Sequence, residues 1–175
     1  MKRRKIYPLA LLAFVMMFTA CKDDTITPPD DTKKQEEVEG TFVGSWTSEN
    51  ADLPTQRLRD TYQKMILTLN DDDTYSWVYQ KKTGEKTTFT GTWAILETED
   101  KHTSGSSFYW MNIYVTHING VEAPGGWQGI AAFENPTNLK VNVEPTVVGW
   151  STWPDSEVGL GSGQSGMDSV FDFSK

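Results

Sequence analysis

The chain has few of the residues on which covalent cross-links and metal centres depend. Its 175 residues include one cysteine and two histidines. A single cysteine cannot form a disulfide within the chain. His102 and His117 have no further histidine or cysteine at the spacing of zinc ligands. We therefore expect no internal disulfide, metal or cofactor, and Cys21 needs another role.

Positive charge is also scarce beyond the N-terminus. The first 20 residues, MKRRKIYPLALLAFVMMFTA, contain four basic residues and then an uncharged stretch from Ile6 to Ala20. A basic start, an apolar stretch short for a bilayer span and small final residues are typical of a secretory signal peptide. Its removal leaves 12 basic and 24 acidic residues, a formal charge of −12. This charge argues against nucleic acid or an anionic lipid surface as a partner.

Cys21 follows Phe18-Thr19-Ala20, where cleavage would make it the new N-terminal residue. The site resembles a bacterial lipobox, although Phe18 replaces the usual leucine. The resemblance implies that a diacylglycerol group is attached to the sulfur of Cys21 and that the new amino end is acylated as well. Since one acyl chain binds a membrane only marginally, two or three chains would make a stable anchor.

The residues after the cysteine, Lys22, Asp23 and Asp24, resemble the signal that directs Bacteroidetes lipoproteins to the outer face of the outer membrane. The alternative is that they only begin a solvated linker. Residues 22–40 contain two adjacent prolines, many charges and no aromatic residue, so burial cannot offset the entropy of ordering them. We expect a signal peptide over 1–20, a lipidated cysteine and flexible linker over 21–40, and a folded domain over 41–175.

Short runs of aromatic and β-branched residues with a two-residue alternation fill the domain, and no persuasive helical period is present. The runs predict strands over 41–48, 61–70, 74–82, 86–97, 108–118, 127–134, 139–148 and 168–175. Turns are expected at 70–73, 83–85 and at Asn119-Gly120, a short helical turn over 53–60, and a loop over 98–107. Antiparallel strands joined in sequence favour a closed, eight-stranded up-and-down barrel, with a β-sandwich as the alternative.

Gly44-Ser45-Trp46 matches the G-x-W signature of lipocalins, and LTLNDDDTYSW followed by FTGTW is similar to the lipocalin-like domains of many Bacteroidetes lipoproteins. The resemblance covers residues 41–175. It implies an up-and-down barrel in which Lys175 packs onto the Trp46 ring. The T-D-Y motif of true lipocalins is missing, so the chain resembles the broader barrel group.

Aromatic residues are the most informative candidates for a binding site, because the chain holds seven tryptophans, six tyrosines and eight phenylalanines. Alternation places ten side chains in the barrel interior, and four of them, Tyr75, Trp77, Trp93 and Trp110, are also ligand-binding candidates. The other six are Phe42, Leu67, Leu69, Phe89, Val141 and Val143. Trp127, Trp150 and Trp153 flank Gly/Pro-rich segments, where they are expected to guard the mouth of the barrel.

Motifs for catalysis are weak. Residues 161–166, GSGQSG, match G-x-G-x-x-G but lack the strand and helix of a dinucleotide site. Acidic residues such as Glu97 and Glu134 have no distinctive spacing. We therefore expect a non-catalytic, surface-tethered barrel that binds a small apolar or amphipathic molecule or a glycan. The alternatives are a ligand-free structural or protein-interaction module of an outer-membrane complex and, least favoured, a glycan-active hydrolase.

Overall fold

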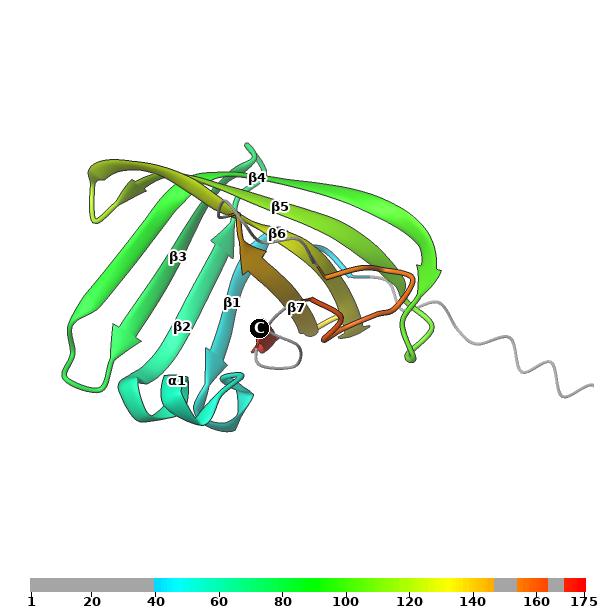
Figure 1. The fold of residues 1–175 in the computed structure, drawn as a ribbon, viewed down its shortest axis with the longest axis horizontal. Helices are drawn as coiled ribbons and strands as arrows, with labels where there is room; N and C mark the ends of the chain where they lie inside the picture. Colours follow the sequence, from blue (N-terminus) through cyan, green and yellow to red (C-terminus); the bar gives the residue numbers. More distant parts are fainter. Residues whose placement is uncertain (1–39, 147–153, 164–168) are drawn as a thin grey trace, which may run out of the picture. The chain divides into compact units, whose positions relative to one another are not determined.

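The structure, a computed structural model, describes residues 40–146, 154–163 and 169–175. Within these ranges eight strands form a closed antiparallel barrel in which each strand pairs with its neighbours in sequence (Figure 1). The strands are β1 (Gly44–Glu49), β2 (Tyr62–Leu69), β3 (Thr74–Lys81), β4 (Lys86–Lys101), β5 (Ser107–Ile118), β6 (Val121–Asn135), β7 (Asn138–Pro145) and β8 (Val170–Ser174). The predicted eight-stranded barrel is thus confirmed, and the sandwich alternative is not.

Between β1 and β2 the chain forms the 3-10 helix η1 (Asn50–Asp52) and the short helix α1 (Gln56–Thr61). The Thr55 hydroxyl caps α1 by accepting a hydrogen bond from the backbone N–H of Leu58 at 3.1 Å. We call the end of the barrel beside α1 the α1 end, and the opposite end the Trp46 end. No helix among the described residues is long and apolar enough to cross a membrane.

The tight turns follow the predicted chemistry. Asn119 and Gly120 have φ angles of 52° and 78°, the left-handed values that a type I′ hairpin requires. The Asn119 side chain also accepts a hydrogen bond from the backbone N–H of Thr88 at 2.8 Å, which links this turn to β4. At the β2–β3 turn, Asp72 accepts hydrogen bonds from the backbone and hydroxyl of Thr74.

Two predicted boundaries are wrong. The loop expected over 98–107 is confined to 102–106, because β4 continues to Lys101, which pairs with Ser107 at the start of β5. The end of β4 was not predicted because its residues are polar on both faces and show no hydrophobic alternation. Strand β6 begins at Val121 rather than at 127, since Gly125 and Gly126 pair with β5. A Cβ on Gly126 would lie 2.5 Å from the Ile113 carbonyl oxygen, so the close approach of the strands requires glycine there.

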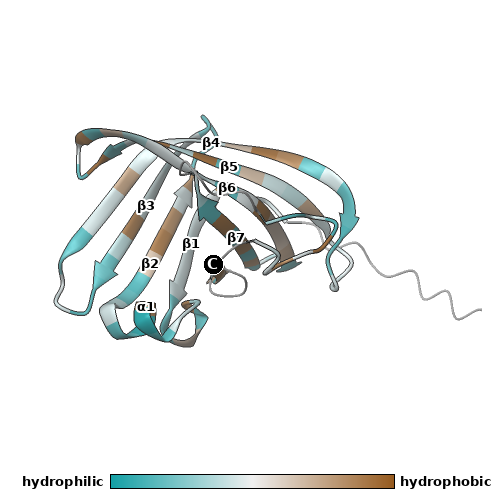
Figure 2. Ribbon diagram, viewed as in Figure 1, coloured by the Kyte–Doolittle hydropathy of each residue, from teal (hydrophilic) through white to brown (hydrophobic). Residues whose placement is uncertain are grey.

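The barrel interior is a continuous apolar cluster, and hydrophobic and hydrophilic positions alternate along the strands (Figure 2). Of the ten predicted interior residues, seven are buried in this cluster: Phe42, Leu67, Leu69, Tyr75, Trp77, Val141 and Val143. Phe89 and Trp93 are half-buried against it.

The prediction for Trp110 is wrong. This side chain lies on the outer face of β5, against a separate cluster of Phe108, Ile130 and Ala132. Because FYWMNIYV is aromatic on both faces, the alternation did not show which face points inward.

The Trp46 end is closed by contacts between β1 and the C-terminal residue of the chain. The Trp46 indole N–H donates to the Phe42 carbonyl oxygen at 2.7 Å. The Lys175 ammonium lies 4.1 Å from the Trp46 ring centroid and donates to the carbonyl oxygens of Thr41 and Val43, each at 3.1 Å. Gly44 has a φ of 137°, and a Cβ there would lie 3.0 Å from the Lys175 side chain, which explains the glycine of the G-x-W motif.

The Trp46–Lys175 contact is testable by a double-mutant cycle. Because a cation over an indole ring stabilises a fold by about 0.5–1 kcal/mol, Trp46→Phe and Lys175→Met should show a coupling of this size in the free energy of unfolding. Urea denaturation measures it. The control cycle pairs Lys175→Met with Trp110→Phe, where no coupling is expected; equal coupling in the two cycles would contradict a direct contact.

Candidate functional site

Six aromatic side chains gather inside the barrel toward the α1 end, and we call them the mouth cluster. They are Tyr62, Trp77, Tyr79, Phe89, Trp127 and Phe171. The ring centroids of Trp77 and Trp127 lie 5.2 Å apart, and those of Phe89 and Trp127 lie 5.1 Å apart. Trp77 is fully buried, whereas Tyr62, Tyr79, Phe89 and Trp127 are half-buried. The side chains of the cluster therefore range from fully buried in the interior to partly exposed at the rim.

Two buried polar atoms lie within or beside this cluster. The Trp77 indole N–H and the Tyr75 hydroxyl have no hydrogen-bond partner among the described residues, although the two side chains are 0% and 2% exposed. A buried polar group without a partner costs about 1–3 kcal/mol. Both groups are donors, so an acceptor that entered this part of the barrel would satisfy them.

Burial also affects the acidity of the interior tyrosines. It raises the pKa of the Tyr75 hydroxyl above its ordinary value. Burial raises the pKa of Tyr79 as well, and the nearby hydroxyls of Tyr62 and Tyr75 raise it further. The site therefore holds neutral phenols under ordinary conditions and can offer them as hydrogen-bond donors.

A hollow of about 480 Å³ adjoins the mouth cluster. Thr55, Arg57, Leu58, Thr61 and Tyr62 line it. Leu58 and Tyr62 also pack against the interior cluster, so the hollow and the aromatic rim of the barrel share the Tyr62 side chain. Its volume lies in the range of sites that bind small molecules.

The structure separates the predicted site residues into groups. Trp77 and Trp127 belong to the mouth cluster, whereas Tyr75 is buried on β3 next to the β2–β3 turn, toward the Trp46 end. Trp93 contacts Phe42 and donates its indole N–H to the Asn70 carbonyl oxygen at 3.2 Å. Trp110 lies outside the barrel. The remaining candidates, Cys21, Lys22, Asp23, Asp24, Trp150 and Trp153, lie outside the described residues.

Four members of the mouth cluster were not among the predicted site residues: Tyr62, Tyr79, Phe89 and Phe171, of which only Phe89 was predicted to lie in the barrel interior. Tyr79 shares the alternation of Tyr75 and Trp77, so the sequence did contain a signal for it. Tyr62 faces inward because a register shift between Tyr62 and Lys64 reverses the alternation of β2 at its start. No sequence pattern indicates that bulge.

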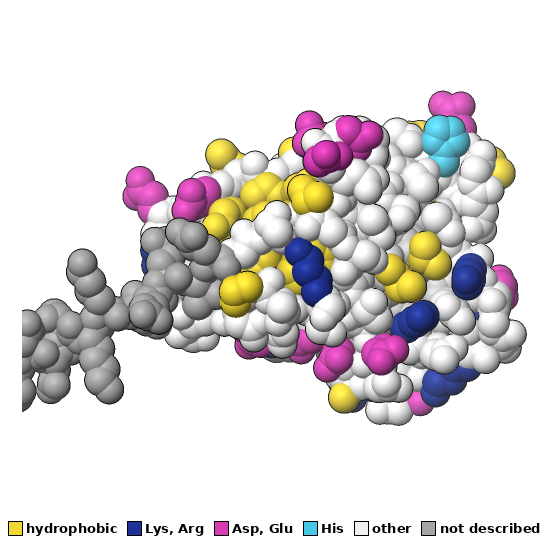
Figure 3. Space-filling model, turned by 180° about the vertical axis from the view of Figure 1, so that it is seen from behind, with side chains coloured by type: hydrophobic (Ala, Val, Ile, Leu, Met, Phe, Trp, Pro, Cys, Tyr) yellow, Lys and Arg dark blue, Asp and Glu magenta, His cyan; other side chains and the backbone are white. Residues whose placement is uncertain are grey.

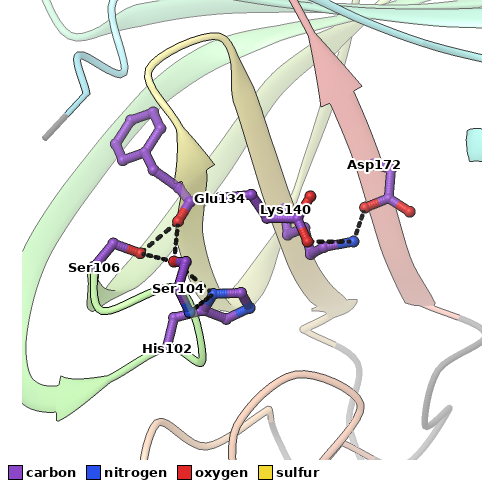
Figure 4. A network of polar contacts seen from close by, with 7 residues as sticks. His102, Ser104, Ser106, Glu134, Lys140 and Asp172 are labelled. Carbon is purple, nitrogen blue, oxygen red and sulfur yellow. Dashed lines mark hydrogen bonds and ion pairs between the residues drawn. The ribbon is translucent and has the colours of Figure 1, made fainter. Parts of the chain in front are cut away.

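A second polar network lies at the β4–β5 turn and on β6 to β8 (Figure 4). Ser104 and Ser106 both donate to the Phe133 carbonyl oxygen, and His102 Nδ1 lies 2.9 Å from the Ser104 hydroxyl. Burial lowers the pKa of His102. Because these groups satisfy one another and a backbone carbonyl, the network fixes the turn against β6.

Ion pairs complete this network. Lys140 contacts Glu134 at 3.3 Å and also pairs with Asp172. Although burial opposes it, the hydrogen bond and charge of Asp172, with those of Glu134, raise the pKa of Lys140. The network thereby ties β6 and β7 to β8.

Comparisons of the chain with protein-family models, with curated proteins and with solved structures find no match. The lipocalin resemblance indicated by Gly44 and Trp46 therefore stays a prediction. The geometry at the α1 end is the basis for a functional proposal.

The raised tyrosine pKa values predict a pH dependence. In the folded protein Tyr75 and Tyr79 should stay protonated above pH 10, near which tyrosines ordinarily ionise. The unfolded chain loses these protons first, so stability is full below about pH 10 and falls as the pH rises above it. Spectrophotometric titration of the native protein checks this, and the variants Tyr75→Phe and Tyr79→Phe identify the signal of each residue. If either variant showed a smaller absorbance change near pH 10 than the wild type, that tyrosine would ionise at the ordinary pH and the prediction would be wrong.

Proposed function

We propose that the protein is a lipid-anchored barrel on the outer membrane, displayed at the cell surface, that binds a small apolar or amphipathic molecule or a glycan without catalysis. The main support is the buried, unpartnered indole N–H of Trp77 beside a half-buried aromatic rim, with the unpartnered Tyr75 hydroxyl deeper in the same interior. An apolar enclosure with a few convergent polar groups is the usual composition of a small-molecule site.

The rings of the mouth cluster define the shape of the proposed site. Trp77 and Trp127 meet edge to face at an interplanar angle of 60°, and Phe89 and Trp127 meet at 81°. A flat or apolar ligand would pack among these rings at the α1 end, where aromatic contacts add about 0.5–1.5 kcal/mol beyond area burial. The donors of Tyr75 and Trp77 would orient its acceptor atoms.

An exposed apolar strip supports a second candidate, a protein-interaction module. Leu96 on β4 is 67% exposed and pairs with the outward Trp110, and Tyr114 on the same face of β5 is 54% exposed. Exposed apolar patches of this kind occur at protein interfaces. This function would use the outer face of the barrel and leave the interior rings without a ligand.

The membrane location rests on the sequence alone. The basic, apolar and small segments of residues 1–20 and the position of Cys21 support lipidation, and Lys22, Asp23 and Asp24 support surface display.

Ligand binding is tested with the neutral fluorophore N-phenyl-1-naphthylamine and the full-length protein. Its fluorescence should increase in the wild type, and Trp127→Ala should weaken binding about tenfold because a ring of the rim is lost. Tyr62→Ala, at the outer part of the rim, should act in the same direction.

The matched control is Trp110→Ala, which removes an indole from the outer face and should leave the fluorophore's affinity unchanged. Near-ultraviolet circular dichroism verifies that each variant is folded. Weaker binding by Trp110→Ala, with no change in Trp127→Ala, would favour the outer-face alternative.

The anchor is tested separately by metabolic labelling with a palmitate analogue. Wild-type protein should take up the label and sediment with membranes, while Cys21→Ser should do neither, because the acyl chains are attached through that residue. Undiminished membrane association of the serine variant would remove the claim. Replacing Asp23 and Asp24 by alanine should reduce the accessibility of the protein to protease on intact cells and leave its lipidation intact.

A further inference from the structure

The basic side chains of the domain are unevenly distributed. Most of them project from the α1 end, where α1, the start of β2 and the β3–β4 turn meet; they are Arg57, Arg59, Lys64, Lys81, Lys82 and Lys86. Figure 3 shows Lys and Arg side chains gathered toward this end of the molecule, at the lower right. In a chain that is strongly acidic as a whole, basic residues are concentrated at this end, where they lie among the acidic Glu49, Asp60 and Glu85.

Several of these cations are not neutralised. Arg59 is used structurally, since it donates to the Leu53 and Pro54 carbonyl oxygens, and Lys81 pairs with Glu85 at 2.8 Å. The other four side chains make no ion pair or hydrogen bond within the described ranges: Arg57, Lys64, Lys82 and Lys86. They are therefore available to an anion.

One of the four, Arg57, lines the hollow beside α1, and the backbone of a second, Lys82, is bonded to a residue of its lining. The Thr61 hydroxyl, also in this lining, donates to the Arg57 carbonyl oxygen at 2.9 Å. The backbone N–H of Lys82 donates to the Thr61 carbonyl oxygen at 3.2 Å, which places residue 82 beside the same hollow. Lys64 and Lys86 instead flank Gln80, with which both are in register on the wall of the barrel.

The hollow also has an apolar side. Leu58 and Tyr62 line it and pack against the interior, and the Tyr62 ring lies 5.6 Å from that of Tyr79 in the mouth cluster. The Arg57 side chain and the rim residue Tyr62 thus border one space of about 480 Å³.

We infer that the α1 end binds an amphipathic organic anion, a molecule with an apolar or ring-containing body and one carboxylate, sulfate, sulfonate or phosphate group. This inference rests on the proposed function and specifies its ligand class. The body lies against Leu58, Tyr62 and the mouth cluster, and the acidic group is held by Arg57 and Lys82. Arg57 suits this role because its planar guanidinium binds oxyanions with two parallel hydrogen bonds.

The acidic group belongs to a free molecule and not to a membrane surface. The domain's net negative charge is repelled by an extended anionic surface, whereas a single small anion meets only the local potential of the α1 end.

Two fluorophores that differ in one group test this inference on the full-length protein. 8-Anilinonaphthalene-1-sulfonate has the rings of N-phenyl-1-naphthylamine and an added sulfonate. The wild type should bind the sulfonate at least fivefold more tightly, and the double variant Arg57→Gln/Lys82→Gln should reduce its affinity to that of the neutral compound. The affinity for the neutral compound should not change.

The matched control is Lys64→Gln/Lys86→Gln, which removes the same charge from the same end but not from the hollow. It should retain most of the preference for the sulfonate. Equal affinities for the two fluorophores in the wild type would overturn the inference while leaving the proposed function intact. No binding of either fluorophore would overturn the proposed function itself.

Vesicles distinguish the source of the anion. Phosphatidylcholine vesicles with and without phosphatidylglycerol should recruit the Cys21→Ser protein equally poorly. Recruitment by the anionic vesicles that is lost equally in both double variants would overturn the assignment to a free molecule.

Discussion

Closure of the barrel between its first and last strands is the constraint on which the rest of the structure depends. Among the described residues, β1 and β8 share one register pair, Thr47 with Ser174. The Lys175 ammonium strengthens this seam: it lies over the Trp46 ring and donates two hydrogen bonds to the segment before β1. Because a closed sheet has no free edge, this seam gives every strand a partner on both sides and encloses the interior.

The closed barrel divides its interior into two unlike ends. At the Trp46 end, Phe42 packs against Tyr109 and Phe133, with ring centroids 4.9 and 4.7 Å apart, and Trp46 finds a partner for its indole N–H. At the α1 end Trp77 is fully buried with its indole N–H unpartnered in the described structure, and four of the surrounding rings are half-buried. The contacts at the Trp46 end therefore stabilise the fold. Among the described residues, the α1 end keeps partly exposed aromatic rings and a donor without a partner, and cations without an ion pair lie around it. Together these features favour an amphipathic anion as the ligand.

The sequence predicts the fold well, because alternation and turn chemistry are local. The eight strands and the interior positions of Trp77 and Val141 follow from a two-residue period, and the Asn119-Gly120 turn follows from the positive φ angles that these two residues adopt readily. The predicted inward face of Trp110 is wrong because its strand is aromatic on both faces. The inward position of Tyr62 was not predicted because a bulge reverses the alternation of β2 at that residue. The hollow could not be predicted at all, since it depends on how α1 packs beside the barrel. The lipid anchor, by contrast, remains a prediction from the sequence alone.

The central claim is that the interior at the α1 end receives a small molecule. Indole N–H resonances in a ¹H–¹⁵N NMR spectrum report on it directly, because each tryptophan contributes one signal that a single Trp→Phe variant assigns. Addition of 8-anilinonaphthalene-1-sulfonate should shift the signals of Trp77 and Trp127 and leave those of Trp46 and Trp110 in place. A shift confined to Trp110, or no shift at a saturating concentration, would contradict the account.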